Sequence, residues 1–224
     1  MNKVIKIAID GPAAAGKSTV AKKIAQKLNY TYIDTGAMYR ALTLKAIQMN
    51  TPFDAEVDLV KVLKNLSIKF VQISDQQHII LDGKDVTESI RAPKVTQNVS
   101  KVAQHKKVRE LMVKRQQELS KTSGVVMDGR DIGTHVLPNA ELKIFLVASV
   151  DERAERRYRE DLSRGFSSNL QDIKAEIIKR DQEDENRTFS PLVKADDAVE
   201  INSTHLSIDE VVTKILQLVN QKII

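Results

Sequence analysis

The sequence has 224 residues, enough for a single α/β domain with a buried core, and it leaves room for an inserted subdomain. Its 42% hydrophobic and 29% charged residues exclude a collagen, a coiled coil and a disordered tail, and the lack of cysteine excludes disulfides and thiol catalysis. The net charge of +5 is compatible with a nucleic acid, with an anionic small substrate or with solubility alone.

The apolar pattern predicts a parallel sheet with helices between its strands. Val4 to Ile9 is a short and nearly continuous apolar run, typical of a central strand that is covered on both faces. Apolar residues then recur at helical spacing from Lys17 to Leu28, and Tyr30 to Ile33 is predicted as a second strand. Three later apolar runs complete a set of five candidate strands: Val125 to Met127, Leu142 to Val147 and Ala198 to Ile201.

The pattern changes between Asn50 and Arg91. After a predicted helix over Asp58 to Leu66, two short runs predict a β-hairpin, Ile68 to Ile73 and His78 to Leu81. Helical stretches over residues 92–104 and 105–120 then lead back to the strand at Val125. We therefore expect residues 50–91 to form an insert on a shared core, and not a free module.

The segment from Gly11 to Ser18, GPAAAGKS, fits the pattern G-x-x-x-x-G-K-[ST] between the first strand and the first helix. Backbone amides of such a loop surround phosphate oxygens, and the following helix adds the positive end of its dipole. Lys17 can reach the terminal phosphates, and the Ser18 hydroxyl can bind Mg²⁺, which prefers oxygen ligands. The motif predicts binding of a nucleoside triphosphate, but GTPases, motor ATPases and small-molecule kinases all share it.

Other segments argue against the first two classes. There is no N-K-x-D segment of the kind that reads guanine in GTPases, and Asp128 is followed by glycine where a motor ATPase has glutamate. Polar residues follow the second strand, from Asp34 to Arg40, and the third strand, from Asp128 to Asp131. Both segments are expected at the carboxyl edge of the sheet, where open α/β sheets bind ligands.

Arginine is concentrated in one region. Seven of the twelve arginines lie between Ser149 and Arg187, which suggests forked contacts to phosphate. The same stretch carries eleven acids, so a helix surface laced with salt bridges remains an alternative. Arg180, Asp184 and Arg187 have the spacing of one helical face, where they could bind one ligand or stabilise the helix.

The motifs GPAAAGKST, DTGAMYR, SIRAP, VREL, DGRDIGT and KRDQEDENR, in this order, resemble the bacterial cytidylate kinases nearly end to end. GKST occurs in many families, whereas DTGAMYR, DGRDIGT and KRD-x-x-D-x-x-R in succession are specific to this one. The resemblance implies an α/β P-loop NTPase fold with a five-stranded parallel sheet of order 2-3-1-4-5, flanking helices, a monophosphate-binding insert and a lid. It also implies transfer of the γ-phosphoryl group of ATP to CMP or dCMP.

The resemblance also implies boundaries and site residues. The core would comprise residues 1–49, 92–150 and 188–224, with the insert at 50–91 and the lid at 151–187. The ATP phosphates would lie against Gly11, Pro12, Ala13, Ala14, Ala15, Gly16, Lys17, Ser18 and Thr19. CMP would be bound by Thr35, Arg109 and Asp131 at the base, by Ser100, Arg180 and Asp184 near the pentose, and by Arg40, Arg130 and Arg187 at the phosphate.

Phosphoryl transfer needs in-line placement and positive charge more than covalent catalysis. The acceptor phosphate is largely deprotonated at pH 7, so Asp128 and Asp131 need not act as bases. We predict that the transition state is stabilised by Mg²⁺ and by Lys17, Arg130, Arg153, Arg157 and Arg187, with a lid that closes to exclude water. Related kinases often have glycine where this chain has Ser18, so the magnesium role of Ser18 depends on mechanism alone.

Two other interpretations stay open. One is a kinase of the same fold that acts on AMP, UMP or shikimate. The other is an ATP-gated binding protein or nucleic-acid partner, which the pI of 9.2 favours and the aromatic content of 4% disfavours. No run approaches the roughly 18 apolar residues that span a bilayer. We expect a cytoplasmic monomer whose partners are ATP, CMP and dCMP, with no nucleic acid and no membrane.

Overall fold

The computed structural model describes residues 4–74, 76–121 and 124–223. The chain divides into two compact units, which we call the phosphate-loop unit (Met1–Tyr32 and Ser120–Ile224) and the second unit (Ile33–Leu119). The predicted insert at residues 50–91 lies within the second unit, which extends further along the chain in both directions.

A five-stranded sheet has the strand order β2-β6-β1-β7-β8. Its strands are β1 (Lys6–Asp10), β2 (Thr31–Asp34), β6 (Val125–Gly129), β7 (Leu142–Val147) and β8 (Val199–Asn202). β1 pairs in parallel with β6 and β7, and β7 pairs in parallel with β8. Counted along the chain among these five strands, the order is 2-3-1-4-5, so the predicted topology is confirmed.

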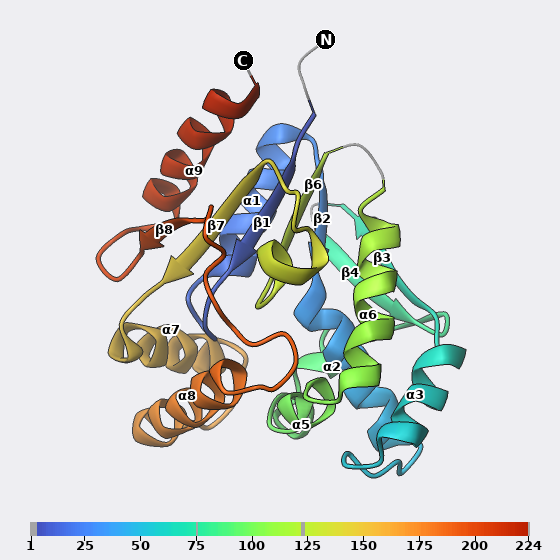
Figure 1. The fold of residues 1–224 in the computed structure, drawn as a ribbon. Helices are drawn as coiled ribbons and strands as arrows, with labels where there is room; N and C mark the ends of the chain where they lie inside the picture. The colour runs from blue at the N-terminus through green and yellow to red at the C-terminus, as the bar shows by residue number, and fades with distance from the viewer. Residues whose placement is uncertain (1–3, 75, 122–123, 224) are drawn as a thin grey trace. The chain divides into compact units, whose positions relative to one another are not determined.

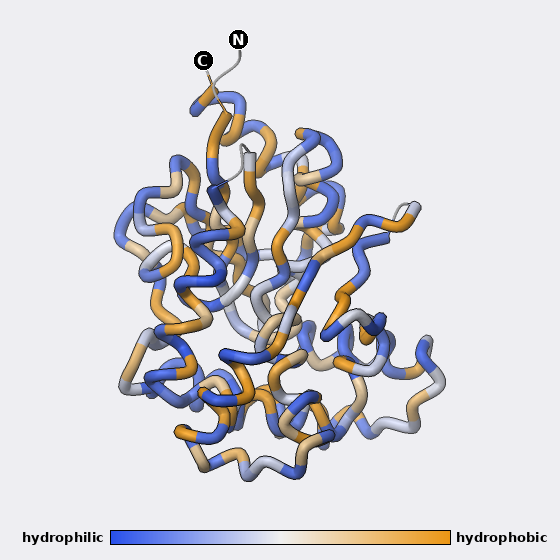
Figure 2. Tube along the Cα trace, turned by 90° about the vertical axis from the view of Figure 1, so that its right-hand side faces the viewer, coloured by the Kyte–Doolittle hydropathy of each residue, from blue (hydrophilic) through white to orange (hydrophobic). Residues whose placement is uncertain are grey.

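β1 lies at the centre of this sheet. Ile7, Ala8 and Ile9 are fully buried, so both faces of the strand are covered, and this explains its nearly continuous apolar sequence. Helices α1 (Lys17–Leu28) and α9 (Ile208–Ile223) contribute to the same core cluster. Figure 2 shows hydrophilic and hydrophobic residues alternating along the helices, as expected when one side of a helix is buried.

Helices α7 (Val150–Ser163) and α8 (Leu170–Glu185) lie side by side beyond the end of β7 (Figure 1). Ser149 begins α7, because its hydroxyl oxygen accepts a hydrogen bond from the backbone N–H of Glu152 at 3.2 Å. The two helices pack through a small apolar cluster of Ala154, Ile173 and Ile177. An exposed ion pair between Lys174 and Asp151 also joins them.

The prediction that Arg180, Asp184 and Arg187 share one helical face is wrong for Arg187. α8 ends at Glu185, so Arg187 lies beyond the helix. The chain folds back there, since the N–H of Leu192 donates to the Asp184 carbonyl at 2.8 Å. The turn nevertheless keeps the Arg187 guanidinium in contact with the Asp184 carboxylate.

The second unit is built around α2 (Thr35–Gln48), which contacts the helical segments that follow it. These segments are α3 (Glu56–Asn65), η1 (Ser89–Arg91), α4 (Pro93–Thr96), α5 (Val99–Ala103) and α6 (Lys106–Leu119). An antiparallel sheet of order β3-β4-β5 contains β3 (Ile68–Ile73), β4 (Gln76–Leu81) and β5 (Lys84–Asp85). The predicted hairpin is confirmed.

The helical stretch predicted over residues 92–104 is interrupted. The Thr96 hydroxyl donates to the Pro93 carbonyl at 3.1 Å, and the Asn98 amide donates to the Lys94 carbonyl at 2.8 Å. Such side chains occupy carbonyl groups of the preceding turn, which favours a break between α4 and α5.

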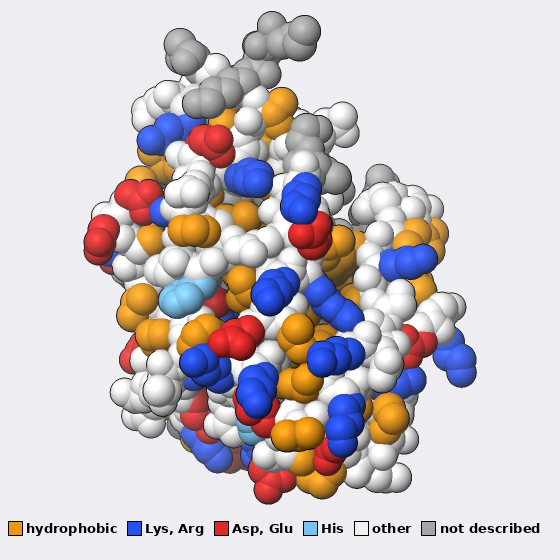
Figure 3. All heavy atoms as spheres, turned by 45° about the vertical axis from the view of Figure 1, so that its right-hand side comes forward, with side chains coloured by type: hydrophobic (Ala, Val, Ile, Leu, Met, Phe, Trp, Pro, Cys, Tyr) orange, Lys and Arg blue, Asp and Glu red, His pale blue; other side chains and the backbone are white. Residues whose placement is uncertain are grey.

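On the face drawn in Figure 3, Lys and Arg side chains lie among acidic and hydrophobic ones. That mixture agrees with a modest net charge of +5. Within residues 4–74, 76–121 and 124–223, no helix is both long enough and apolar enough to cross a membrane.

Candidate active site

The phosphate loop connects β1 to α1, where the motif predicts it. Gly11 and Gly16 have φ angles of 145° and 90°, which favour glycine, and Ala14 is left-handed at 58°. Gly11 also has no room for a side chain, because a Cβ atom would lie 2.0 Å from the carbonyl oxygen of Leu146 in β7. The neighbouring strand therefore requires glycine at the start of the loop.

Lys17 is the first residue of α1 and is only 5% exposed. Its ammonium group folds back over the loop and donates to the Pro12 carbonyl at 2.6 Å. Burial lowers the pKa of Lys17 to about 7, and the positive charge of Arg130 adds to the effect, while Asp128 and Asp10 oppose it. An anion beside this amine, such as a nucleotide phosphate, would favour the charged form of Lys17.

Ser18 and Asp128 place two oxygen atoms that could bind a metal ion beside the loop. The Ser18 hydroxyl donates to Asp128 Oδ2 at 2.8 Å, and the Tyr32 hydroxyl donates to Asp128 Oδ1 at 2.7 Å. Among the described residues no group of three or more acidic or histidine side chains could hold a metal ion. A hydroxyl and one carboxylate nevertheless fit Mg²⁺, which takes its other ligands from water and nucleotide phosphates.

One carboxylate of α8, that of Asp184, pairs with two predicted site arginines. Asp184 accepts from Arg130 Nε at 2.8 Å and also pairs with Arg187. Burial favours the neutral form of Asp184, but Arg130, Arg187 and Arg180 outweigh it and lower its pKa. The predicted residues Arg130, Arg180, Asp184 and Arg187 are thus electrostatically coupled within the phosphate-loop unit.

The first turn of α7 contacts the phosphate loop. Arg153 Nη1 donates to the Ala13 carbonyl at 3.1 Å, and Arg153 Nε donates to the Ala148 carbonyl at 3.0 Å. Arg156 donates to the carbonyl and the hydroxyl of Ser203 at 2.7 Å and 3.1 Å. Arg157 instead pairs with Asp161 on its own helix at 3.0 Å. Arg156 Nη1 also donates to the Ala15 carbonyl at 3.5 Å, so Arg153 and Arg156 both contact the loop, and Arg153 makes the shorter hydrogen bond to it.

Asp10 is a buried residue of the site that the sequence analysis missed. Its carboxylate accepts hydrogen bonds from two consecutive backbone N–H groups, Ile132 at 2.8 Å and Gly133 at 2.7 Å. These amides belong to η2 (Ile132–Val136), a short π-helical turn that begins after the buried Asp131. Asp10 thereby fixes the segment after β6 against the end of β1. The sequence signal available for Asp10 was an acidic residue at the end of a buried apolar strand.

We expect Asp10→Asn to flatten the dependence of stability on pH between about 4 and 7. Burial raises the pKa of Asp10 from 3.8 to about 7, so over this range the folded state keeps a proton that the unfolded state has released. This group therefore contributes less stability as pH rises, with a limiting slope of about 1.4 kcal/mol per pH unit. Urea unfolding of both proteins at pH 4.5 to 8 measures the difference, and identical slopes would contradict the expectation.

In the second unit, predicted acceptor residues lie on α2. Thr35 is the first residue of the helix and is buried. Asp34 caps the helix by accepting from the N–H of Ala37 at 2.7 Å, and Arg40 pairs with the same carboxylate at 3.1 Å. The capping carboxylate therefore orients the arginine that is predicted to hold the acceptor phosphate.

The other two predicted acceptor residues of this unit lie on α5 and α6. Arg109 is 2% exposed, donates to the Ala103 carbonyl at 3.1 Å and lies 5.4 Å from the centre of the Tyr39 ring. Such a cation over an aromatic face is held in place by the ring. Ser100 lies half-buried on α5. The sequence analysis did not predict the contact of Tyr39 with Arg109.

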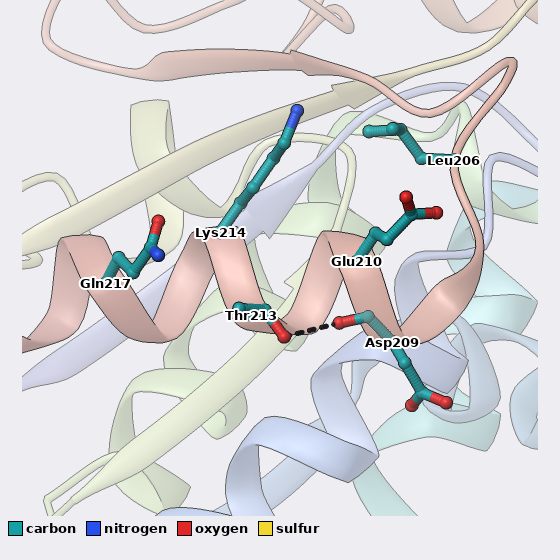
Figure 4. Close-up of a pocket in the computed structure, with 6 residues that line it drawn as sticks. All are labelled: Leu206, Asp209, Glu210, Thr213, Lys214 and Gln217. Atoms are coloured by element: carbon teal, nitrogen blue, oxygen red, sulfur yellow. Dashed lines mark hydrogen bonds between the residues drawn. The ribbon is translucent and has the colours of Figure 1, made fainter.

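A hollow of about 510 Å³ lies elsewhere, along α9. It is lined by Leu206, Asp209, Glu210, Thr213, Lys214 and Gln217. Figure 4 shows Lys214 and Glu210 on the same side of the helix, and the Thr213 hydroxyl donates to the Asp209 carbonyl at 2.8 Å. None of the predicted site residues lines this hollow.

Comparison with known proteins identifies the family. Residues 7–221 match the family model described as cytidylate kinase. A cytidylate kinase of Bacillus cereus strain B4264 is 60% identical over 220 residues, 98% of each chain, and one of Bacillus thuringiensis strain Al Hakam is 59% identical over the same length. A crystal structure of an uncharacterized protein from Eubacterium ventriosum shares the fold, with a TM-score of 0.52 and 13% identity over 98% of this chain and 99% of that one. The chain therefore belongs to the cytidylate kinase family.

Proposed function

We propose that this protein transfers the γ-phosphoryl group of ATP to CMP or dCMP, giving CDP or dCDP. The observation that carries the proposal is the grouping of buried and partly buried cations in the phosphate-loop unit. Lys17 and Arg153 both donate to carbonyls of the loop, and Arg130 is close enough to lower the pKa of Lys17. Phosphoryl transfer requires this kind of fixed positive charge around the transferred group.

The donor would be bound by the phosphate loop. We infer that the amides of residues 11–19 surround the ATP phosphates and that Lys17 contacts the terminal ones. Ser18 would hold Mg²⁺ together with Asp128, since both supply oxygen ligands and lie within hydrogen-bond distance of each other. The ion would supply charge neutralisation on the phosphates.

The arginines would stabilise the transition state. Arg130 and Arg187 are kept in place by Asp184 and do not have to be ordered at the moment of reaction. We infer that they and Arg153 contact phosphate oxygens. Arg157 would join them only if its pairing with Asp161 is broken, as closing of a lid over residues 151–187 could do.

The acceptor base would be read by three residues. Cytosine presents an amine donor at position 4 and acceptors at N3 and O2. Asp131 and Thr35 can accept a hydrogen bond, and Arg109 can donate several. We infer that Ser100, Arg180 and Asp184 lie near the pentose and that Arg40, Arg130 and Arg187 hold the phosphate. Residues 50–91 would act as the monophosphate-binding insert of a cytoplasmic monomer.

We expect CMP and dCMP to be the preferred acceptors. UMP has an acceptor at position 4 where cytosine has a donor, so a buried group is left unpaired, at a cost of about 1 to 3 kcal/mol per mismatch. This corresponds to a loss of roughly fivefold to 150-fold in kcat/KM. An ADP-release assay with CMP, dCMP, UMP, AMP and shikimate at fixed ATP measures it. Turnover of AMP, UMP or shikimate in preference to CMP would overturn the assignment of the acceptor.

A further inference from the structure

Three acceptor groups contact the guanidinium of Arg153. Two are the backbone carbonyls of Ala148 and Ala13, and the third is the carboxylate of Asp181 on α8, with Arg153 Nη1 and Asp181 Oδ2 2.7 Å apart. Both side chains of this ion pair are largely buried, at 5% and 13% exposed. The pair therefore joins α8 to an arginine that touches the phosphate loop.

Several positive charges lie close together in the phosphate-loop unit. Arg130 lies close enough to Lys17 to lower its pKa, so cations in this unit repel one another when no anion is bound. Asp184 opposes this repulsion at Arg130 and Arg187. Asp181 lies one helical turn before Asp184 and does the same for Arg153, and its charge also favours the charged form of Arg130.

The ion pair of Asp181 with Arg153 is one of several contacts between α7 and α8. The apolar cluster of Ala154, Ile173 and Ile177 packs the two helices together, and Lys174 pairs with Asp151 at their exposed side. The second oxygen of Asp181, Oδ1, is buried and accepts a hydrogen bond from no described residue. Burying a carboxylate in this way is unfavourable unless its charge serves the neighbouring arginine.

We propose that Asp181 is a positioning residue, which holds the Arg153 guanidinium against the phosphate loop so that it is in place for the transferred phosphoryl group. This inference deepens the proposed function and depends on it. Asp181 acts through Arg153 and does not touch the substrate. Because a displacement of about 1 Å in a catalytic group can cost up to a hundredfold in rate, loss of the carboxylate affects turnover more than substrate binding.

The test is a double-mutant cycle with kcat as its readout. Asp181→Asn preserves the shape of the side chain and removes its charge, and we expect it to lower kcat by about tenfold to a hundredfold while KM for ATP and CMP changes less than threefold. In an Arg153→Met background, Asp181→Asn is expected to change kcat by less than twofold. A purely structural role would lower kcat by the same factor in both backgrounds.

Asp151→Asn is the matched control, because it removes an ion pair between the same two helices that does not involve Arg153. It should leave kcat within twofold of wild type. If Asp181→Asn does not fold, as judged by circular dichroism, the same cycle is run with Asp181→Glu, which keeps the charge and displaces it by one methylene.

The proposal is overturned if the Asp181 variant keeps kcat within twofold of wild type, or if its effect is the same with and without Arg153. Failure of the proposed function gives a different result, since wild-type protein would then not phosphorylate CMP in the same assay. The cycle is in that case run with the acceptor that the wild type does use.

Discussion

Lys17→Met is expected to lower kcat for phosphoryl transfer by about a hundredfold to a thousandfold, the range found when one fixed donor to a developing charge is removed. Lys17 is buried at the start of α1, and its amine is held over the loop by the Pro12 carbonyl. Methionine has a similar length without the charge, so the loop should keep its shape. Steady-state turnover of CMP with saturating ATP measures the effect.

Lys23→Met is the control for this experiment. Lys23 lies further along the same helix, is 42% exposed and pairs with Asp209 at 2.7 Å. Exposed ion pairs contribute little to stability, so kcat should stay within twofold of wild type. A Lys17→Met protein that keeps more than a tenth of the wild-type rate would show that the amine is not part of the catalytic machinery.

Gly11→Ala is expected to cost at least about 3 kcal/mol of unfolding free energy, a value reached only by severe steric or polar defects. The new methyl group would lie 2.0 Å from the Leu146 carbonyl oxygen, far inside van der Waals contact. Neither group can move easily, since β1 and β7 are paired along their lengths. Urea unfolding followed by circular dichroism measures the loss.

Gly165→Ala separates the steric clash from backbone strain. Gly165 also has a left-handed φ, of 77°, but no atom lies within 4 Å of a Cβ built there. Its cost should be about 1 to 2 kcal/mol, the penalty of the left-handed conformation alone. Equal losses for the two variants would refute the steric argument at Gly11.

The parallel sheet could be predicted because its central strand is buried on both faces. Ile7, Ala8 and Ile9 follow one another without a polar residue, and few structures other than a covered strand require this. β5 could not be predicted, since its two residues, Lys84 and Asp85, are too few for any periodicity. Strand pairing with β4, and not local sequence, determines it.

The site was predicted less completely than the fold. A spacing rule is enough to predict roles for Lys17 and Ser18, because the phosphate loop is a local motif. Which acid pairs with which arginine is a matter of tertiary structure, and eleven acids lie between Ser149 and Arg187. The contact between Asp181 and Arg153 depends on the packing of α7 against α8, which no local sequence pattern specifies. The same holds for Asp10, whose partners lie more than a hundred residues away.

The hydrogen bond from Tyr32 to Asp128 places a fluorescent side chain beside the predicted phosphate site. The chain has four tyrosines and no tryptophan, so tyrosine fluorescence is not masked by a stronger emitter. Tyr32 is 6% exposed, and its phenol donates to the carboxylate that also accepts from Ser18. A cation or nucleotide that breaks the hydrogen bond between Tyr32 and Asp128 changes the environment of the phenol, so tyrosine emission is expected to report binding without a dye or a label.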